Sequence, residues 1–228
     1  MAVALPMESN PETMNKYLFK LGVPDKWRMV DVIGLEGEAL TWVPRPVLAV
    51  ILLFPLSDVY EQHRRDQENE LLNKGLRAPK DVFHLKQVLS HVCGTIALVH
   101  SVANNTHNIE LKDGLLKNYL RDAKGLDSSA KGALLENSEA ILQAYKDIVY
   151  TETDNNAEAN EIVNNHFVTF ICKNGSLFEL DGRKALPINH GPSSPETFLE
   201  DAAKVCRDFI AREPDNIGFN VVALVPAQ

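Results

Sequence analysis

The run from Val47 to Phe54 is the feature that most constrains how this chain can fold. It holds eight consecutive residues without a polar or charged side chain. Because apolar and polar residues do not alternate along it, the run predicts a strand buried on both faces. It is much shorter than the ~20 residues that a membrane-spanning helix needs. The rest of the chain must therefore cover this strand from two sides.

The remaining pattern mixes helices and strands without a repeat or a break in composition. The best-marked helix has Asn10 as a cap, Pro11 at its first position, and Gly22 and Pro24 at its end. An Asn174-Gly175 pair predicts a hairpin turn. We expect helices near 11–21, 57–74, 93–103, 111–122, 129–149 and from Ser194 onward, and strands at 27–33, 47–54, 166–172, 177–180 and 218–225. This order predicts a single α+β domain over residues 1–228, in which 93–103 is a helix buried almost all round and 57–74 a solvated one.

Composition narrows the class of protein. Charged residues are 24% and apolar residues 45% of the chain, which is ordinary for a globular protein. Three cysteines are too few for a disulfide framework, and no secretory signal opens the chain, so we expect a reducing compartment, the cytoplasm or also the nucleus. The net charge of −8 argues against binding to a nucleic-acid backbone. No Cys/His cluster has zinc spacing, so no metal or cofactor is expected.

Cys93 is the most informative single residue. It stands at the start of the apolar helix, where free backbone amides stabilise a thiolate. From its position alone, a buried structural cysteine is an equally good interpretation. Cys172 lies in an expected strand and Cys206 on the apolar stripe of a helix, so packing is the better interpretation for both.

A cysteine nucleophile needs a base and a group that orients that base. His166 is the best candidate for the base, because it begins an expected strand, and Asp181 ends the next one. Side chains of two hairpin-related strands can meet, although such a spacing is common by chance. The other histidines fit less well: we expect His63, His84 and His107 on the surface, His91 facing solvent, and His100 too far along the helix to reach the sulfur.

Gln87 is the candidate for stabilising an oxyanion. It precedes Cys93 by six residues, and its amide could donate a hydrogen bond beside the Cys93 backbone N–H. Without further information, a polar residue on a solvated turn is the more common interpretation.

The amino-acid sequences around Gln87, Cys93, His166 and Asp181 provide further evidence for these roles. Residues 87–105 (QVLSHVCGTIALVHSVANN) closely resemble the nucleophile segment of ubiquitin C-terminal hydrolases. The segments His166-Phe-Val and 177–184 (LFELDGRK) resemble the histidine and aspartate segments of the same family. The likeness extends through 5–12, 43–50, 187–191 and Phe219-Asn220, and so covers essentially the whole chain. It looks like the short, single-domain subtype.

The resemblance implies a role for each matched residue. Cys93 would be the nucleophile, His166 the general base and then acid, Asp181 its orienter and Gln87 the oxyanion donor. The implied fold is papain-like, with a central antiparallel sheet between helices, a knotted chain and a crossover loop at about 150–161 over the active site. The implied ubiquitin contacts are Pro6, Met7, Glu8, Ser9, Asn10, Pro11, Asn216, Ile217, Gly218, Phe219, Asn220 and Val221.

The expected activity is thiol-dependent hydrolysis at the C-terminal glycine of ubiquitin, which releases small adducts and processes precursors. A ubiquitin-binding reservoir with little turnover is the main alternative, and a general papain-like protease is a third. We expect a monomer without a membrane partner, and the sequence leaves open whether the related modifier Nedd8 is accepted. Ala97, where relatives often carry Gly, and Asn165 depart from the family pattern at positions that affect packing or specificity.

Overall fold

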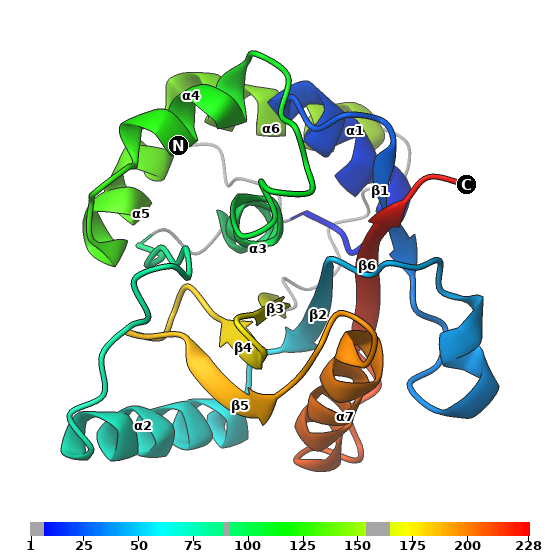
Figure 1. The fold of residues 1–228 in the computed structure, drawn as a ribbon, viewed down its shortest axis with the longest axis vertical. Helices are drawn as coiled ribbons and strands as arrows, with labels where there is room; N and C mark the ends of the chain where they lie inside the picture. Colours follow the sequence, from blue (N-terminus) through cyan, green and yellow to red (C-terminus); the bar gives the residue numbers. More distant parts are fainter. Residues whose placement is uncertain (1–6, 89–91, 154–164) are drawn as a thin grey trace.

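The computed structural model describes residues 7–88, 92–153 and 165–228, which are organised around a six-stranded sheet (Figure 1). The strand order is β1-β6-β2-β3-β4-β5, and every neighbouring pair is antiparallel. The strands are β1 (Trp27–Asp31), β2 (Ala49–Pro55), β3 (Asn165–Lys173), β4 (Ser176–Leu180), β5 (Ile188–Pro192) and β6 (Asn220–Pro226). The helices are α1 (Pro11–Leu21), α2 (Asp58–Asn73), α3 (Cys93–Ala103), α4 (Leu115–Asp122), α5 (Ser128–Glu136), α6 (Glu139–Thr153) and α7 (Phe198–Ala211), with a 3₁₀ helix η1 (Gly37–Trp42).

Strand β2 is an interior strand that is covered on both faces. It pairs with β3 on one side and with β6 on the other. Ala49 and Ile51 belong to the hydrophobic cluster on one face of the sheet, whereas Val50, Leu52 and Phe54 belong to the cluster on the opposite face. The prediction from the uninterrupted apolar run is therefore confirmed.

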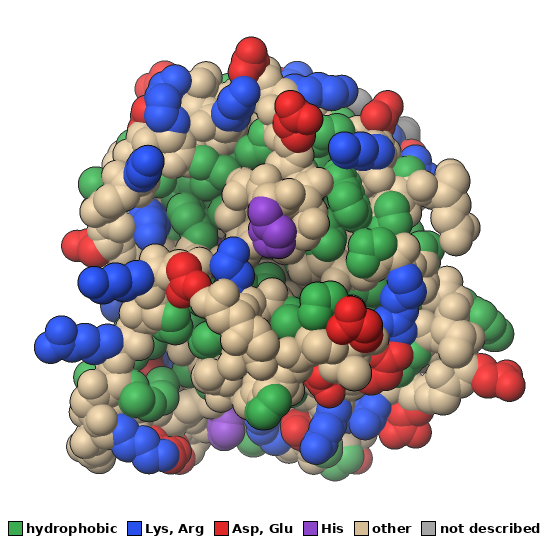
Figure 2. All heavy atoms as spheres, viewed as in Figure 1, with side chains coloured by type: hydrophobic (Ala, Val, Ile, Leu, Met, Phe, Trp, Pro, Cys, Tyr) green, Lys and Arg blue, Asp and Glu red, His purple; other side chains and the backbone are tan. Residues whose placement is uncertain are grey.

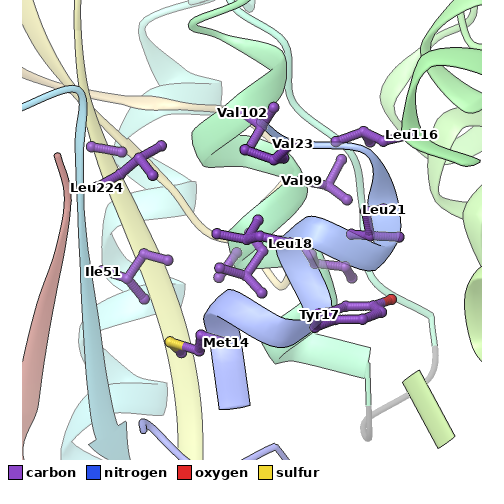
Figure 3. Close-up of a cluster of buried hydrophobic side chains, with 14 of the residues drawn as sticks. Met14, Tyr17, Leu18, Leu21, Val23, Ile51, Val99, Val102, Leu116 and Leu224 are labelled. Atoms are coloured by element: carbon purple, nitrogen blue, oxygen red, sulfur yellow. The ribbon is translucent and has the colours of Figure 1, made fainter. Parts of the chain in front are cut away.

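Helix α3 lies on one face of the sheet and is enclosed by α1 and the helices α4 to α6 (Figure 1). All of its residues from Cys93 to Val102 are buried, as predicted. Figure 3 shows how side chains of α1, α3 and the sheet meet there, among them Leu18, Val99 and Ile51. A helix enclosed in this way holds its first residue in a fixed position.

Helix α7 covers the opposite face of the sheet (Figure 1). It buries Phe198, Leu199, Cys206 and Phe209 against that face, and Cys206 has no exposed surface. A packing role for Cys206 is thus confirmed.

The hairpin between β3 and β4 turns at Asn174 and Gly175, as predicted. Both residues have positive φ, 49° and 72°, which is the backbone that a type I′ turn requires. The turn fixes the pairing in which Thr169 lies opposite Leu180. It therefore also fixes where residue 181 emerges relative to the start of β3.

The prediction of a single helix at 129–149 is wrong, because the structure has two helices, α5 and α6, in this region. The Asn137 side chain caps the end of α5 by donating to the Ala133 carbonyl at 2.8 Å, and the Ser138 carbonyl accepts from Leu142 at the start of α6. The break lets Leu135 and Ile141 both enter the core.

Four smaller differences concern the starts of two helices and two elements that the sequence pattern missed. Helix α4 begins at Leu115 after an extended Gly114, and α7 begins at Phe198 because Ser194 to Thr197 form a separate turn. Strand β5 and helix η1 were not expected. The α+β class with a central antiparallel sheet is confirmed, and the knotted path stays a prediction.

Charges of both signs are intermixed on the face shown in Figure 2, so the net negative charge is not gathered into one patch there. Within the part of the chain that the structure describes, no helix has the length and apolar character needed to cross a membrane.

Candidate active site

Cys93 is the first residue of α3, as the sequence analysis expected. Its side chain is 5% exposed, and Val92 precedes the helix without a side-chain cap. The first-turn amides of a helix have no partner within the helix and favour a negative charge nearby. A Cβ on the next residue, Gly94, would lie 3.0 Å from the Cβ of Met7, so glycine allows the N-terminal segment to pack directly beside the thiol.

His166 and Asp181 meet at the ends of β3 and β4. His166 Nε2 lies 2.7 Å from Asp181 Oδ1, and both side chains are almost fully buried. A carboxylate only accepts, so Nε2 carries the proton of this hydrogen bond. The predicted pairing of the two residues across the hairpin is confirmed.

The contact between His166 and Asp181 shifts the pKa values of both side chains. Burial alone would lower the pKa of His166, but the Asp181 charge and hydrogen bond, with a further contribution from Cys93, raise it to about 9. Burial also opposes the charged form of Asp181, yet the positive charges of His166 and Lys184 and the Tyr60 hydrogen bond hold its pKa well below the usual range. The pair therefore favours an imidazolium beside a carboxylate.

The Cys93 thiol lies close enough to His166 to help raise the pKa of the imidazole. Because Nε2 faces Asp181, Nδ1 is the ring nitrogen left for the sulfur. The imidazole and the Phe54 ring pack edge to face, with ring centroids 5.7 Å apart at 85°, which limits rotation of the imidazole. The structure thus brings together a thiol, an imidazole and a carboxylate in the order that nucleophilic catalysis needs.

Gln87 is tied to the turn that follows Asp181. Its backbone N–H donates to the Gly182 carbonyl at 2.8 Å, and a Cβ on Gly182 would lie 2.9 Å from the Gln87 Cβ. Only glycine at position 182 leaves room for this approach. The half-buried Gln87 is therefore held in register with Asp181, although 94 residues separate them in the sequence.

The expectation that His84 lies on the surface is wrong. His84 is buried, and its Nε2 lies 3.0 Å from the Asp181 carbonyl oxygen while Nδ1 lies 2.7 Å from Ser128 Oγ. Burial lowers its pKa, so the ring is neutral and Nε2–H donates while Nδ1 accepts. A histidine with both nitrogens satisfied can be buried. The partners of His84 are distant in sequence, so the local pattern does not predict its burial. Its position three residues before Gln87 is the one signal in the sequence that places it near the site.

The other histidines and cysteines differ in their exposure. His107 is exposed, as expected, His63 is half-buried, and His91 lies outside the described residues. His100 is fully buried and stacks on His84 with ring centroids 5.4 Å apart. Cys172 is half-buried in β3, and burial raises the pKa of its thiol.

A cleft of about 290 Å³ opens beside the thiol. Its lining includes Cys93, the N-terminal segment 7–10, and the first residues of β3 and β6, among them Asn165 and Asn220. The Asn220 amide donates to the Ser9 carbonyl at 2.9 Å, which fixes the N-terminal segment beside β6. Two of the segments predicted to contact a partner therefore meet at the cleft.

The predicted contact residues differ in accessibility. Met7 is buried, whereas Glu8 and Asn10 are exposed, Ser9 and Pro11 are half-buried, and Pro6 lies outside the described residues. In the second segment Ile217 is 96% exposed and Gly218 is exposed, Asn216, Phe219 and Asn220 are half-buried, and Val221 is buried. Of the expected crossover loop, 150–153 end α6 and 154–161 lie outside the described residues. Of the two departures from the family pattern, Ala97 is buried and Asn165 lines the cleft.

The sequence of this chain is similar to those of known proteins. The family model described as ubiquitin carboxyl-terminal hydrolase, family 1, matches residues 4–211. A ubiquitin carboxyl-terminal hydrolase of Drosophila melanogaster is 45% identical over 223 residues, which cover 98% of this chain and 97% of the relative. The isozyme L1 enzyme of Homo sapiens is 45% identical over 97% of this chain and 98% of its own.

Solved structures show the same fold. The catalytic domain of Trichinella spiralis UCH37, bound to ubiquitin vinyl methyl ester, matches with a TM-score of 0.77 over 99% of this chain and 97% of that chain, at 22% identity. A second crystal structure of the same protein bound to that ligand matches with a TM-score of 0.74, covering 98% of this chain and 82% of that chain at 23% identity.

Proposed function

This chain belongs to family 1 of the ubiquitin carboxyl-terminal hydrolases, and we propose that its hydrolysis runs through Cys93, His166, Asp181 and Gln87. It is a cysteine-type ubiquitinyl hydrolase, which cleaves bonds at the C-terminal glycine of ubiquitin. The observation that carries the residue assignment is the buried His166–Asp181 pair, whose imidazole is influenced by the Cys93 thiol at the cleft.

The reaction is acyl transfer. The Cys93 thiolate attacks the carbonyl carbon of the terminal glycine, and the Gln87 amide and the Cys93 backbone N–H donate to the oxyanion that forms. His166 gives its Nδ1 proton to the leaving amine, so that a thioester remains on Cys93. The imidazole then takes a proton from water, which hydrolyses the thioester, while Asp181 holds the ring throughout.

The cleft and its two flanking segments are the proposed ubiquitin site. The cleft reaches the thiol, and the exposed side chains of Glu8 and Ile217 stand in the two segments whose contacts the resemblance predicts. Glycine at the scissile bond suits a narrow passage, because any side chain there would add bulk. Basic residues near the ubiquitin tail fit a chain of net charge −8.

We further propose a monomeric cytoplasmic enzyme that is also present in the nucleus. The absence of a disulfide framework in the sequence supports a reducing compartment. Acceptance of Nedd8 is a second proposal, which its relation to ubiquitin as a modifier supports.

Release of a fluorophore from ubiquitin C-terminal amide tests the assignment. Cys93→Ala should abolish release and keep ubiquitin binding, and Gln87→Ala should lower kcat by ~10²–10³-fold with a smaller change in KM. Cys172→Ala, which removes a thiol away from the cleft, is the control and should keep full activity.

The outcomes separate the alternatives. A parent protein that binds ubiquitin without releasing the fluorophore would be the reservoir. Cleavage of unfolded protein or short peptides without ubiquitin would indicate a general protease. An unchanged kcat in Gln87→Ala would remove Gln87 from the mechanism.

A further inference from the structure

Helix α2 touches the turn that carries Asp181 at four points. Besides a contact from Tyr60 to Asp181, the Glu61 carboxylate pairs with Arg183. Farther along α2, the Gln67 amide oxygen accepts from Lys184 Nζ at 2.7 Å, and a Glu68 carboxylate oxygen accepts from the backbone N–H of Ala185 at 3.0 Å. A helix that the sequence describes as solvated therefore braces the catalytic turn along its length.

Tyr60 makes the contact nearest to the reacting atoms. It is the one residue of α2 classed as buried, at 4% exposure, and its hydroxyl donates to Asp181 Oδ2. The other carboxylate oxygen, Oδ1, accepts from His166 Nε2 at 2.7 Å and from the Arg183 backbone N–H at 2.8 Å. Both oxygens of a carboxylate with no exposed surface are thus occupied, each by a different element of the fold.

The Tyr60 hydroxyl is a permanent and well-placed donor. Burial and the neighbouring Asp181 charge raise the pKa of Tyr60 far above its usual value, so the proton stays on the hydroxyl at any working pH. The Tyr60 ring packs against Phe54 with centroids 4.8 Å apart, and its backbone N–H is capped by Ser57 Oγ at 3.1 Å. Both contacts limit the movement of the phenol relative to Asp181.

We propose that Tyr60 is a positioning residue for the hydrolase reaction, holding the Asp181 carboxylate in the orientation that directs Oδ1 at His166. Without a donor on Oδ2, the carboxylate can rotate about its Cβ–Cγ bond and present either oxygen to the imidazole. His166 then spends less time with Nδ1 aimed at the Cys93 sulfur. Tyr60 acts through Asp181 and does not line the cleft beside the thiol. The inference rests on the roles proposed above for Asp181 and His166.

Tyr60→Phe removes the hydroxyl and keeps the ring. Because hydrogen bonds to charged groups are among the stronger ones in proteins, we expect kcat on the fluorogenic ubiquitin amide to fall roughly tenfold, with KM within about twofold. Tyr119→Phe is the matched control: Tyr119 is also 4% exposed, and its hydroxyl donates to the Lys131 carbonyl at 2.9 Å, away from the site. That variant should keep the parent kcat.

A double-mutant cycle separates positioning from packing. In an Asp181→Ala background, adding Tyr60→Phe should lower kcat less than twofold, because Tyr60 has lost the group through which it acts. Each kcat is calculated from the concentration of active enzyme, which is measured by titrating Cys93 with an electrophilic ubiquitin probe. An unfolded fraction of the protein therefore does not affect the rate constant.

Two results would overturn the proposal. One is a Tyr60→Phe enzyme with a kcat within twofold of the parent, and the other is the same tenfold loss in the Asp181→Ala background as in the parent. If the parent itself released no fluorophore, the proposed function would fail instead, so the two failures are distinguishable.

Discussion

Gly132 lies in the middle of α5, and its replacement by alanine has two physical effects that oppose each other. Alanine is the best helix former, and by propensity alone the substitution should stabilise α5 by ~1 kcal/mol. However, the Cβ of alanine would lie 1.8 Å from the Lys86 carbonyl oxygen, and real Cβ atoms essentially never come closer than 3.0 Å to such an atom. The two backbones must therefore separate by at least 3.0 − 1.8 = 1.2 Å.

The steric effect should exceed the propensity. Overpacking costs about 1–3 kcal/mol, and the upper end applies because the obstructing atom is backbone, which cannot rotate away. Separation also weakens the hydrogen bond from the Lys86 N–H to the Ser128 carbonyl, now 2.9 Å long, at a cost of ~1 kcal/mol. The net loss is about 3 kcal/mol, which lowers Tm by roughly 6–12 °C for a domain of this size.

Activity should fall as well, because Lys86 directly precedes Gln87. A displacement of about 1 Å near a catalytic group can cost ~10²-fold in rate. Thermal unfolding and kcat on the fluorogenic amide measure both effects, and Ser129→Ala, an exposed change in the same helix, is the control. A Gly132→Ala protein with an unchanged or higher Tm and the parent kcat would refute the reasoning.

Two further predictions concern the thiols and the titration of the imidazole. An electrophilic ubiquitin probe should label Cys93 and spare Cys172 and the fully buried Cys206, and peptide mapping that placed the adduct on either of those would contradict the assignment. The pKa of His166 is about 9 in the folded protein, above its usual 6.5, so its charged form contributes stability that is complete below pH 6.5 and lost as pH rises through about 9. Urea unfolding from pH 6 to 10 should show this loss in the parent and a weaker one in Asp181→Asn; equal slopes would contradict it. Hydrolysis should fall over the same interval.

Local patterns were enough to predict the parts of the fold that depend on neighbours in sequence. The apolar run of β2 and the buried α3 follow from composition along one element, and the hairpin follows from an Asn-Gly pair. That hairpin brought His166 to Asp181 without knowledge of the rest of the chain. The His166–Asp181 contact therefore rests on a signal that can be read from a short segment, whereas the contact of Gln87 with Gly182 joins distant parts of the chain.

Contacts between distant segments could not be predicted in this way. The break at Asn137 depends on how Leu135 and Ile141 pack, which the helical periodicity of 129–149 does not record. Tyr60 lies 121 residues from Asp181, and nothing in its local sequence sets it apart from other residues of a charged helix. His84 was placed on the surface because its polar neighbours in sequence are not its neighbours in space.

The position of β6 has a consequence for how the chain is made on the ribosome. Strand β6 lies between β1 and β2, yet it is the last of the three to be synthesised. At ~5–20 residues per second, roughly 10–30 s pass between the emergence of β2 and that of β6. During that interval β1 and one edge of the apolar strand β2 have no native partner, and such edges recruit other chains. This enzyme should therefore depend on chaperones that shield β1 and β2 until translation has delivered residues 220–226.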